Sequence, residues 1–160
     1  MENLVGNEIG LIHLISSCFA LLFGTFVLIA KKGTKKHVQI GYLYLVSMGI
    51  LISTAFMIYR LFNGWGIFHY TTMVSLISIL LGMIPIWTKK PKNNWKYLHF
   101  SFMYWSVIGL YAAFAAEILV RIPNTPFFGM VGIATGIIMI AGGIGFGIKI
   151  AKWKRIFETE

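Results

Sequence analysis

The sequence predicts an all-α integral membrane protein, a bundle of five transmembrane helices with its N-terminus outside and its C-terminus in the cytoplasm. Three observations predict this. Hydrophobic residues make up 58% of the 160 residues and charged residues only 12%, which is outside the usual range of soluble domains. Five apolar stretches each approach the roughly 20 residues that cross a hydrocarbon core. The basic residues gather mainly at alternate ends of these stretches, which is the positive-inside pattern.

The five stretches lack the period-two alternation of barrel strands, so we expect each of them to be a helix. Glu2 and Glu8 stand where a secretory signal would carry positive charge, so no cleaved leader is expected. Little chain remains outside the stretches, and we expect residues 1–160 to form a single transmembrane domain. The predicted helices span residues 9–30, 38–59, 68–87, 97–120 and 127–148.

Polar segments mark the ends of each helix in turn. The first helix ends at a run of lysines, and the second ends before Arg60. The turn signal KKPKNN (89–94) separates the third helix from the fourth, and NTP (124–126) separates the fourth from the fifth. Lys149 follows the fifth helix directly. Every helix is therefore bounded by residues that favour the interface or a turn.

The net charge of +9 does not indicate nucleic-acid binding, because all the basic residues except Arg60 and Arg121 fall on one predicted side of the membrane. That distribution fixes the cytoplasmic side and predicts a multi-pass protein of the plasma membrane. It also favours contact with anionic lipid headgroups. The large clusters are Lys31, Lys32, Lys35 and Lys36; Lys89, Lys90, Lys92 and Lys96; and Lys149, Lys152, Lys154 and Arg155.

Each of the four histidines lies near an end of a different helix. His13 and His69 belong to the predicted outer side, and His37 and His99 to the cytoplasmic side. An imidazole at headgroup depth is often only an interfacial anchor, and this alternative stays open. The other interpretation is that the histidines bind a cofactor, with one pair holding a haem b near each face.

The histidines share helical faces with small and polar residues, at about 100° per residue. His13 aligns with Ser17 and Gly24, and His37 aligns with Tyr44. In a membrane bundle such faces turn inward. Two His-x-x-x-Met spacings also occur, in which imidazole and thioether lie on one helical face and suit a soft metal or haem iron. They are His69 with Met73 and His99 with Met103.

Glu117 lies on the His99 face, in the outer half of the fourth helix. A carboxylate inside a span costs about 2.5–3.5 kcal/mol on insertion scales, so it is expected to have a partner. His13 and His69 with Glu117 form a candidate zinc or copper site, because zinc accepts nitrogen and carboxylate oxygen. The alternatives are a structural ion pair or a neutral carboxyl group. The remaining candidate partners are Arg60 and Arg121.

The fifth helix carries glycines at the spacing that favours close helix contact. Gly132 with Gly136 and Gly143 with Gly147 form two G-x-x-x-G pairs on one face. We expect this face to pack on another helix, either in the same chain or in a second copy or other membrane partner. A homodimer through the fifth helix is one outcome.

Three segments together resemble domain-of-unknown-function family 2306, a group of predicted bacterial integral-membrane proteins. They are KKGTKKHVQIGYLYLVSMG (31–49), WGIFH (65–69) and WKYLHFSFMYWSVIGLYAAFAAEILVRIP (95–123). The resemblance covers roughly residues 24–123 and rests on His37, Gly41, Tyr44, His99, Met103 and Ser106. Members typically have arginine after the first histidine and often after the second, where this chain has Val38 and Phe100. The resemblance implies membrane location and a histidine pattern, but no reaction. The layout is also similar to the transmembrane dihaem cytochromes b, an architectural analogy.

Two function hypotheses follow from these observations. The first is a redox or metal-binding membrane protein that holds haem, zinc or copper through histidines and carries electrons across the membrane. The second is a membrane assembly factor, transport partner or immunity-type protein without a cofactor, which works by contact. No H-E-x-x-H motif, phosphate loop or serine elbow is present, so enzymatic activity is not indicated.

The predicted topology places the C-terminus in the cytoplasm, because five spans put the two ends on opposite sides. Green fluorescent protein fused after Glu160 is therefore expected to fluoresce, and alkaline phosphatase fused at the same place is expected to be inactive. An active phosphatase fusion would contradict the helix number or the orientation.

Overall fold

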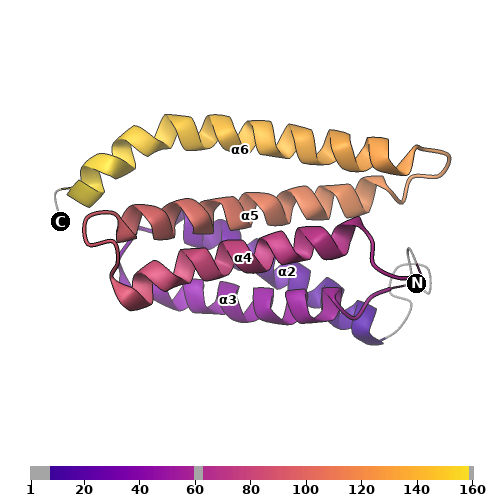
Figure 1. Cartoon of the computed structure of the whole chain (residues 1–160), viewed down its shortest axis with the longest axis horizontal. Coiled ribbons are helices and arrows are strands. Elements are labelled where there is room, and N and C mark those ends of the chain that lie inside the picture. Colours follow the sequence, from indigo (N-terminus) through magenta and orange to yellow (C-terminus); the bar gives the residue numbers. More distant parts are fainter. Residues whose placement is uncertain (1–7, 60–62, 159–160) are drawn as a thin grey trace. The chain divides into compact units, whose positions relative to one another are not determined.

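The computed structural model describes residues 8–59 and 63–158, and among positions 151–158 it describes the side chain of Trp153 alone. Within these ranges there is no strand, and five helices are long and apolar enough to cross a membrane (Figure 1). The all-α prediction with five candidate spans is therefore confirmed. The helices are α2 (Glu8–Ile29), α3 (Lys35–Ala55), α4 (Ile67–Thr88), α5 (Trp95–Leu119) and α6 (Phe127–Glu158).

The contacts divide the chain into two compact units, and the division falls within α4. The first unit is Met1–Leu76 and holds α2, α3 and the start of α4. The second unit is Ile77–Glu160 and holds the rest of α4 with α5 and α6. The expectation of a single domain over residues 1–160 stays a prediction.

In the first unit, α2 and α3 form an antiparallel hairpin (Figure 1). Lys32 ends α2 by donating from Nζ to the carbonyls of Val27 and Leu28, at 2.7 and 2.9 Å, which satisfies oxygens that have no intrahelical partner. Thr34 then caps α3, because its hydroxyl accepts from the His37 backbone N–H at 3.2 Å. His37 therefore lies in the first turn of α3, which begins three residues before the predicted start.

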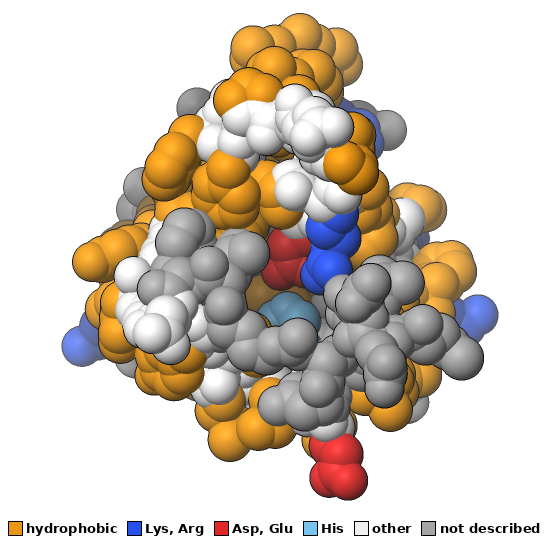
Figure 2. Space-filling view, turned by 90° about the vertical axis from the view of Figure 1, so that its right-hand side faces the viewer, with side chains coloured by type: hydrophobic (Ala, Val, Ile, Leu, Met, Phe, Trp, Pro, Cys, Tyr) orange, Lys and Arg blue, Asp and Glu red, His pale blue; other side chains and the backbone are white. Residues whose placement is uncertain are grey.

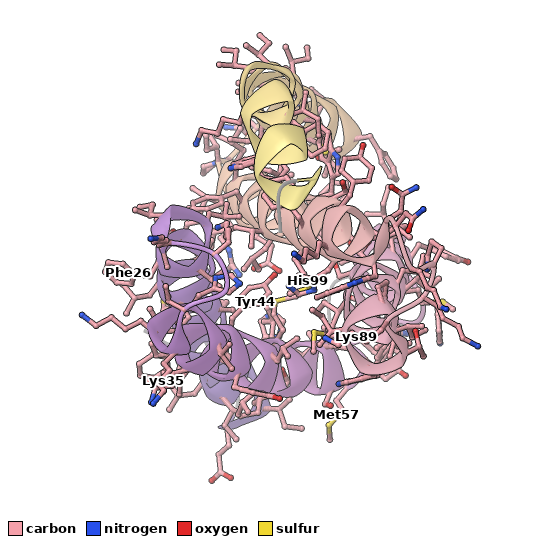
Figure 3. All side chains as sticks on the ribbon, turned by 90° about the vertical axis from the view of Figure 1, so that its left-hand side faces the viewer. Phe26, Lys35, Tyr44, Met57, Lys89 and His99 are labelled. Atoms are coloured by element: carbon pink, nitrogen blue, oxygen red, sulfur yellow. The ribbon has the colours of Figure 1, made fainter. Side chains whose placement is uncertain are left out.

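The helical faces that carry small and polar residues are buried, as expected. On α2 the buried residues include Ser17, Ala20 and Gly24, and on α3 they include Tyr44 and Met48. The opposite side of α2 is apolar and exposed, and Figure 3 shows Phe26 pointing away from the hairpin. This division fits a helix that presents one face to protein and the other to lipid.

α3 ends at Ala55, four residues before the predicted end. The Phe56 N–H donates to the Ile52 carbonyl at the end of the helix, and the Met57 N–H donates to the Thr54 carbonyl in a further turn. The chain then leaves the helix axis, and the ring of Tyr59 stacks on His69 of α4 at 5.0 Å between centroids. The apolar residues after Ala55 thus form a loop that packs on α4, although their hydrophobicity alone predicts more helix.

In the second unit, α5 and α6 run side by side (Figure 1). The buried Tyr104 hydroxyl donates to the Gly142 carbonyl at 2.8 Å. Around this bond, rings of both helices form one aromatic cluster: Phe100, Tyr104, Trp105, Phe146 and Trp153.

α6 continues to Glu158, ten residues beyond the predicted end. Its extension is held by Trp153, whose ring lies 3.8 Å from that of Phe100 between centroids. The lysines after Ile148 favour helix and no glycine or proline interrupts it, so the helix has no reason to stop where the apolar run stops.

Two glycines of α6 outside the predicted packing face lie closest to α5. A Cβ at Gly142 would lie 2.5 Å from Ile108 Cγ2, and one at Gly145 would lie 3.0 Å from the Tyr104 hydroxyl. Gly143 has only a 3.9 Å contact with Trp105. The other three glycines of the predicted face, Gly132, Gly136 and Gly147, have no described atom within 4 Å of that position. Among the described residues of the second unit, the predicted face is therefore largely open.

Exposed hydrophobic side chains are frequent on the described helices, and Figure 2 shows them on the outside of the molecule. Along α6, Ile133, Ile137, Ile140 and Ile144 are each more than half exposed. Such a surface is unfavourable in water and favourable in a hydrocarbon core.

Replacement of Gly142 by alanine is expected to lower the free energy of unfolding by about 1–3 kcal/mol. The new methyl group would collide with Ile108, whose β-branched side chain has little freedom in a helix. Chemical unfolding in detergent measures the change. Gly49→Ala is the matched control, because nothing lies within 4 Å of that position; an equal loss in both variants would contradict the close contact.

Candidate functional site

His13 connects α2 to α3 within the first unit. Its Nδ1 lies 3.1 Å from Thr54 Oγ1. The Thr54 hydroxyl uses its own hydrogen on the carbonyls of Ile50 and Leu51, at 2.8 and 2.9 Å. The hydroxyl oxygen therefore accepts from Nδ1–H of His13, and Nε2 is the nitrogen that keeps a lone pair. The half-buried His13 is thus an inter-helix contact as well as a candidate ligand.

His99 contacts α4 within the second unit (Figure 3). Its Nδ1 lies 2.8 Å from the carbonyl oxygen of Gly82. A carbonyl can only accept, so Nδ1 carries the hydrogen and Nε2 the lone pair. One turn further along α5, Met103 packs against the same glycine: a Cβ there would lie 2.7 Å from Met103 Sδ. Gly82 therefore lets both side chains approach the α4 backbone, and Met103 is buried and not a lipid-facing residue.

In His69 the two ring nitrogens have the opposite roles to those in His13 and His99. It lies in the first turn of α4, 4% exposed, with its ring between Tyr59 and Trp65 at 5.0 and 5.2 Å between centroids. The Gly66 N–H donates to its Nδ1 at 3.2 Å. Because a backbone N–H can only donate, Nδ1 holds the lone pair, and the neutral ring carries its hydrogen on Nε2.

The structure bears differently on the two predicted histidine pairs, His13 with His69 and His37 with His99. His13 and His69 both belong to the first unit but have separate partners, Thr54 and Gly66. His37 belongs to the first unit and His99 to the second, so their pairing stays a prediction.

The predicted metal site receives no support. Among residues 8–59 and 63–158, no three side chains of His, Cys, Asp or Glu form a group that could hold a metal ion. Arg121 donates from Nε to the backbone carbonyl of Glu117 at 3.2 Å. Arg60, another predicted partner of Glu117, lies outside the described residues, as do Glu2 and the side chains of Lys152, Lys154 and Arg155.

Thr54, Gly66 and Gly82 are the site residues that sequence reasoning missed. Thr54 is a polar residue in an apolar run, at the depth of His13, which is a usable signal. Gly82 precedes Pro85 by less than one turn of α4, but nothing in the pattern connects it to His99. The contacts of Trp65 and Tyr59 with His69 have no signal in the hydrophobic pattern.

A family model described as "Predicted membrane protein (DUF2306)" matches residues 10–148. The predicted family resemblance is thereby confirmed over most of the chain, and the likeness to dihaem cytochromes b stays an analogy. No curated protein and no solved structure matches the chain.

Proposed function

The chain belongs to the DUF2306 family of predicted membrane proteins, and from that premise we propose that it binds a redox-active metal, as haem iron or as copper, through His99. We place it in the plasma membrane, with its N-terminus outside and its C-terminus in the cytoplasm, from the positive-inside pattern. Transmembrane electron transfer is the activity that such a centre would serve.

The single observation that carries this proposal is the hydrogen bond from His99 Nδ1 to the Gly82 carbonyl, 2.8 Å long. A metal-binding imidazole needs a lone pair on one nitrogen, and it almost always donates from the other to a carbonyl, carboxylate or water. His99 meets both requirements. The carbonyl fixes the tautomer and the ring orientation.

Met103 adds a second, softer donor on the same helical face. Its thioether lies against Gly82, one turn from His99. Imidazole with thioether suits copper and haem iron better than it suits zinc, because sulfur is a soft ligand. Nearby Phe100 and Met103 are buried and would exclude water from the centre. When bound, the metal would supply one-electron chemistry, and the chain would hold and orient it.

His69 does not fit the role of a ligand through Nε2. Its Nδ1 is occupied as an acceptor by Gly66 N–H, so Nε2 carries hydrogen. Metal binding there would require the Gly66 bond to break and the proton to move. The proposal therefore rests on His99 and Met103 of the second unit, and not on an outer site.

An oxidised-minus-reduced visible spectrum with metal analysis of the purified protein tests this proposal. We expect haem bands or stoichiometric copper in the wild type, and at least a tenfold loss in His99→Ala, about the effect that even supporting residues have on metal affinity. His13→Ala, in the other unit, is the control and should keep the metal. A colourless, metal-free wild type would overturn the proposal, and so would full metal content in His99→Ala.

The second candidate function is a contact-based membrane component that associates through α6. The observation that favours it is the open space at Gly132, Gly136 and Gly147, where no described atom lies within 4 Å of a Cβ. A face of this kind lets a second backbone approach closely, which stabilises helix pairs in lipid. A second copy of the chain is the partner we propose, with anionic headgroups around the basic helix ends.

Gly136→Leu is expected to weaken self-association about tenfold, because a leucine side chain keeps the two backbones apart. Sedimentation equilibrium in detergent measures the monomer–dimer constant. Ile137→Leu, an exposed position on the same helix outside the glycine face, is the control. A wild type that stays monomeric at all concentrations would exclude this candidate.

A further inference from the structure

A buried ring nitrogen in the first turn of α4 has no hydrogen-bond partner among the described residues. It is Nε2 of His69, on a side chain that is only 4% exposed. The other ring nitrogen accepts from Gly66 N–H, so the neutral ring has its hydrogen on Nε2. His69 thus presents a buried N–H donor without an acceptor.

Buried donors are nearly always paired, because an unmade hydrogen bond leaves the full cost of removing the group from water. The cost is higher still near a hydrocarbon core, where no bulk water can compensate. An acceptor from outside the chain would remove it. His69 is therefore a candidate binding residue, in a role different from that of a metal ligand.

The surroundings define what kind of acceptor fits. Tyr59 and Trp65 stack on the imidazole at 5.0 and 5.2 Å, so an acceptor reaches the ring at its edge and not by stacking. No acidic residue occurs between Asn63 and Leu76. His69 also lies in the first turn of α4, a 22-residue helix, where the helix dipole favours negative charge. An anionic oxygen meets these conditions best.

The position of the site within the membrane indicates the source of that oxygen. α4 is about 33 Å long at 1.5 Å per residue, so its first turn lies near the headgroups. Trp65 and Tyr70 are 55% and 62% exposed, as expected of aromatic residues at the interface. Phosphate groups of phospholipids are the abundant anionic acceptors at this depth.

We propose that His69 Nε2–H, together with the N-terminal end of α4, binds a phosphate oxygen, presented by a phospholipid headgroup or by free phosphate. Tyr59 is 43% exposed, so this ring and that of Trp65 form a partly exposed cover over the imidazole. The site is independent of the metal proposed at His99, and either proposal can fail alone.

Histidine side-chain NMR tests the site on the unmodified sequence. The protein is labelled with ¹⁵N-histidine, delipidated in dodecyl maltoside, and titrated with short-chain phosphatidylglycerol or with inorganic phosphate; His69→Gln assigns the signal. We expect the Nε2–H tautomer and a saturable downfield shift of that proton with lipid. The same shift with inorganic phosphate alone supports free phosphate as the source. An Nδ1–H tautomer, or no shift with either compound, would overturn the proposal.

A matched pair of variants separates binding from packing. His69→Asn keeps an acceptor for Gly66 N–H but lacks the distal donor, and His69→Gln keeps a donor near the Nε2 position. Native mass spectrometry is expected to find phosphatidylglycerol binding about tenfold weaker in the first variant, the loss of one hydrogen bond to a charged group, and nearly unchanged in the second. An equal loss in both would assign His69 a purely structural role.

Discussion

Lipid gives the polar groups of this chain no solvent partner, and the other features of the structure depend on that constraint. The hydroxyls of Ser16, Ser17 and Ser47 donate to carbonyls of their own helices, three or four residues back. Longer polar side chains donate to carbonyls of neighbouring helices instead: Tyr104 donates to a carbonyl of α6, and His99 donates to a carbonyl of α4. Each such bond satisfies a side chain and fixes the position of two helices at once.

Those bonds require backbones to come close, and glycine is what permits the approach. The carbonyl of Gly82 accepts a hydrogen bond from the His99 ring of α5, and that of Gly142 accepts one from the Tyr104 hydroxyl. A Cβ at either glycine would clash with an α5 side chain. In an apolar medium, where burial of hydrocarbon gives no net driving force between helices, such close contact is the main source of association. The same residues therefore build the second unit and orient its histidine.

The five helices, their inward faces and the family were predictable, because each depends on local length and periodicity or on a short motif. The ends of two helices were not. The residues after Ala55 are apolar, yet they form a loop that packs on His69. Several residues after Ile148 are charged, yet the helix continues, and Trp153 in this part of α6 packs on Phe100. The tautomers were also out of reach, since they depend on partners distant in sequence, as with His13 and Thr54 or His99 and Gly82. Histidines that look alike in the sequence thus differ in chemistry: His13 and His99 donate from Nδ1, whereas His69 accepts there.

The length of α6 has a mechanical consequence. Its 32 residues make a rod of about 48 Å, against a hydrocarbon thickness of about 30 Å, and an average tilt of about 20° shortens its reach only slightly. The helix is therefore too long for the hydrocarbon core alone and continues into the headgroup region. Trp153 lies in this extension, so its contact with Phe100 keeps α6 on α5 beyond the end of the apolar run.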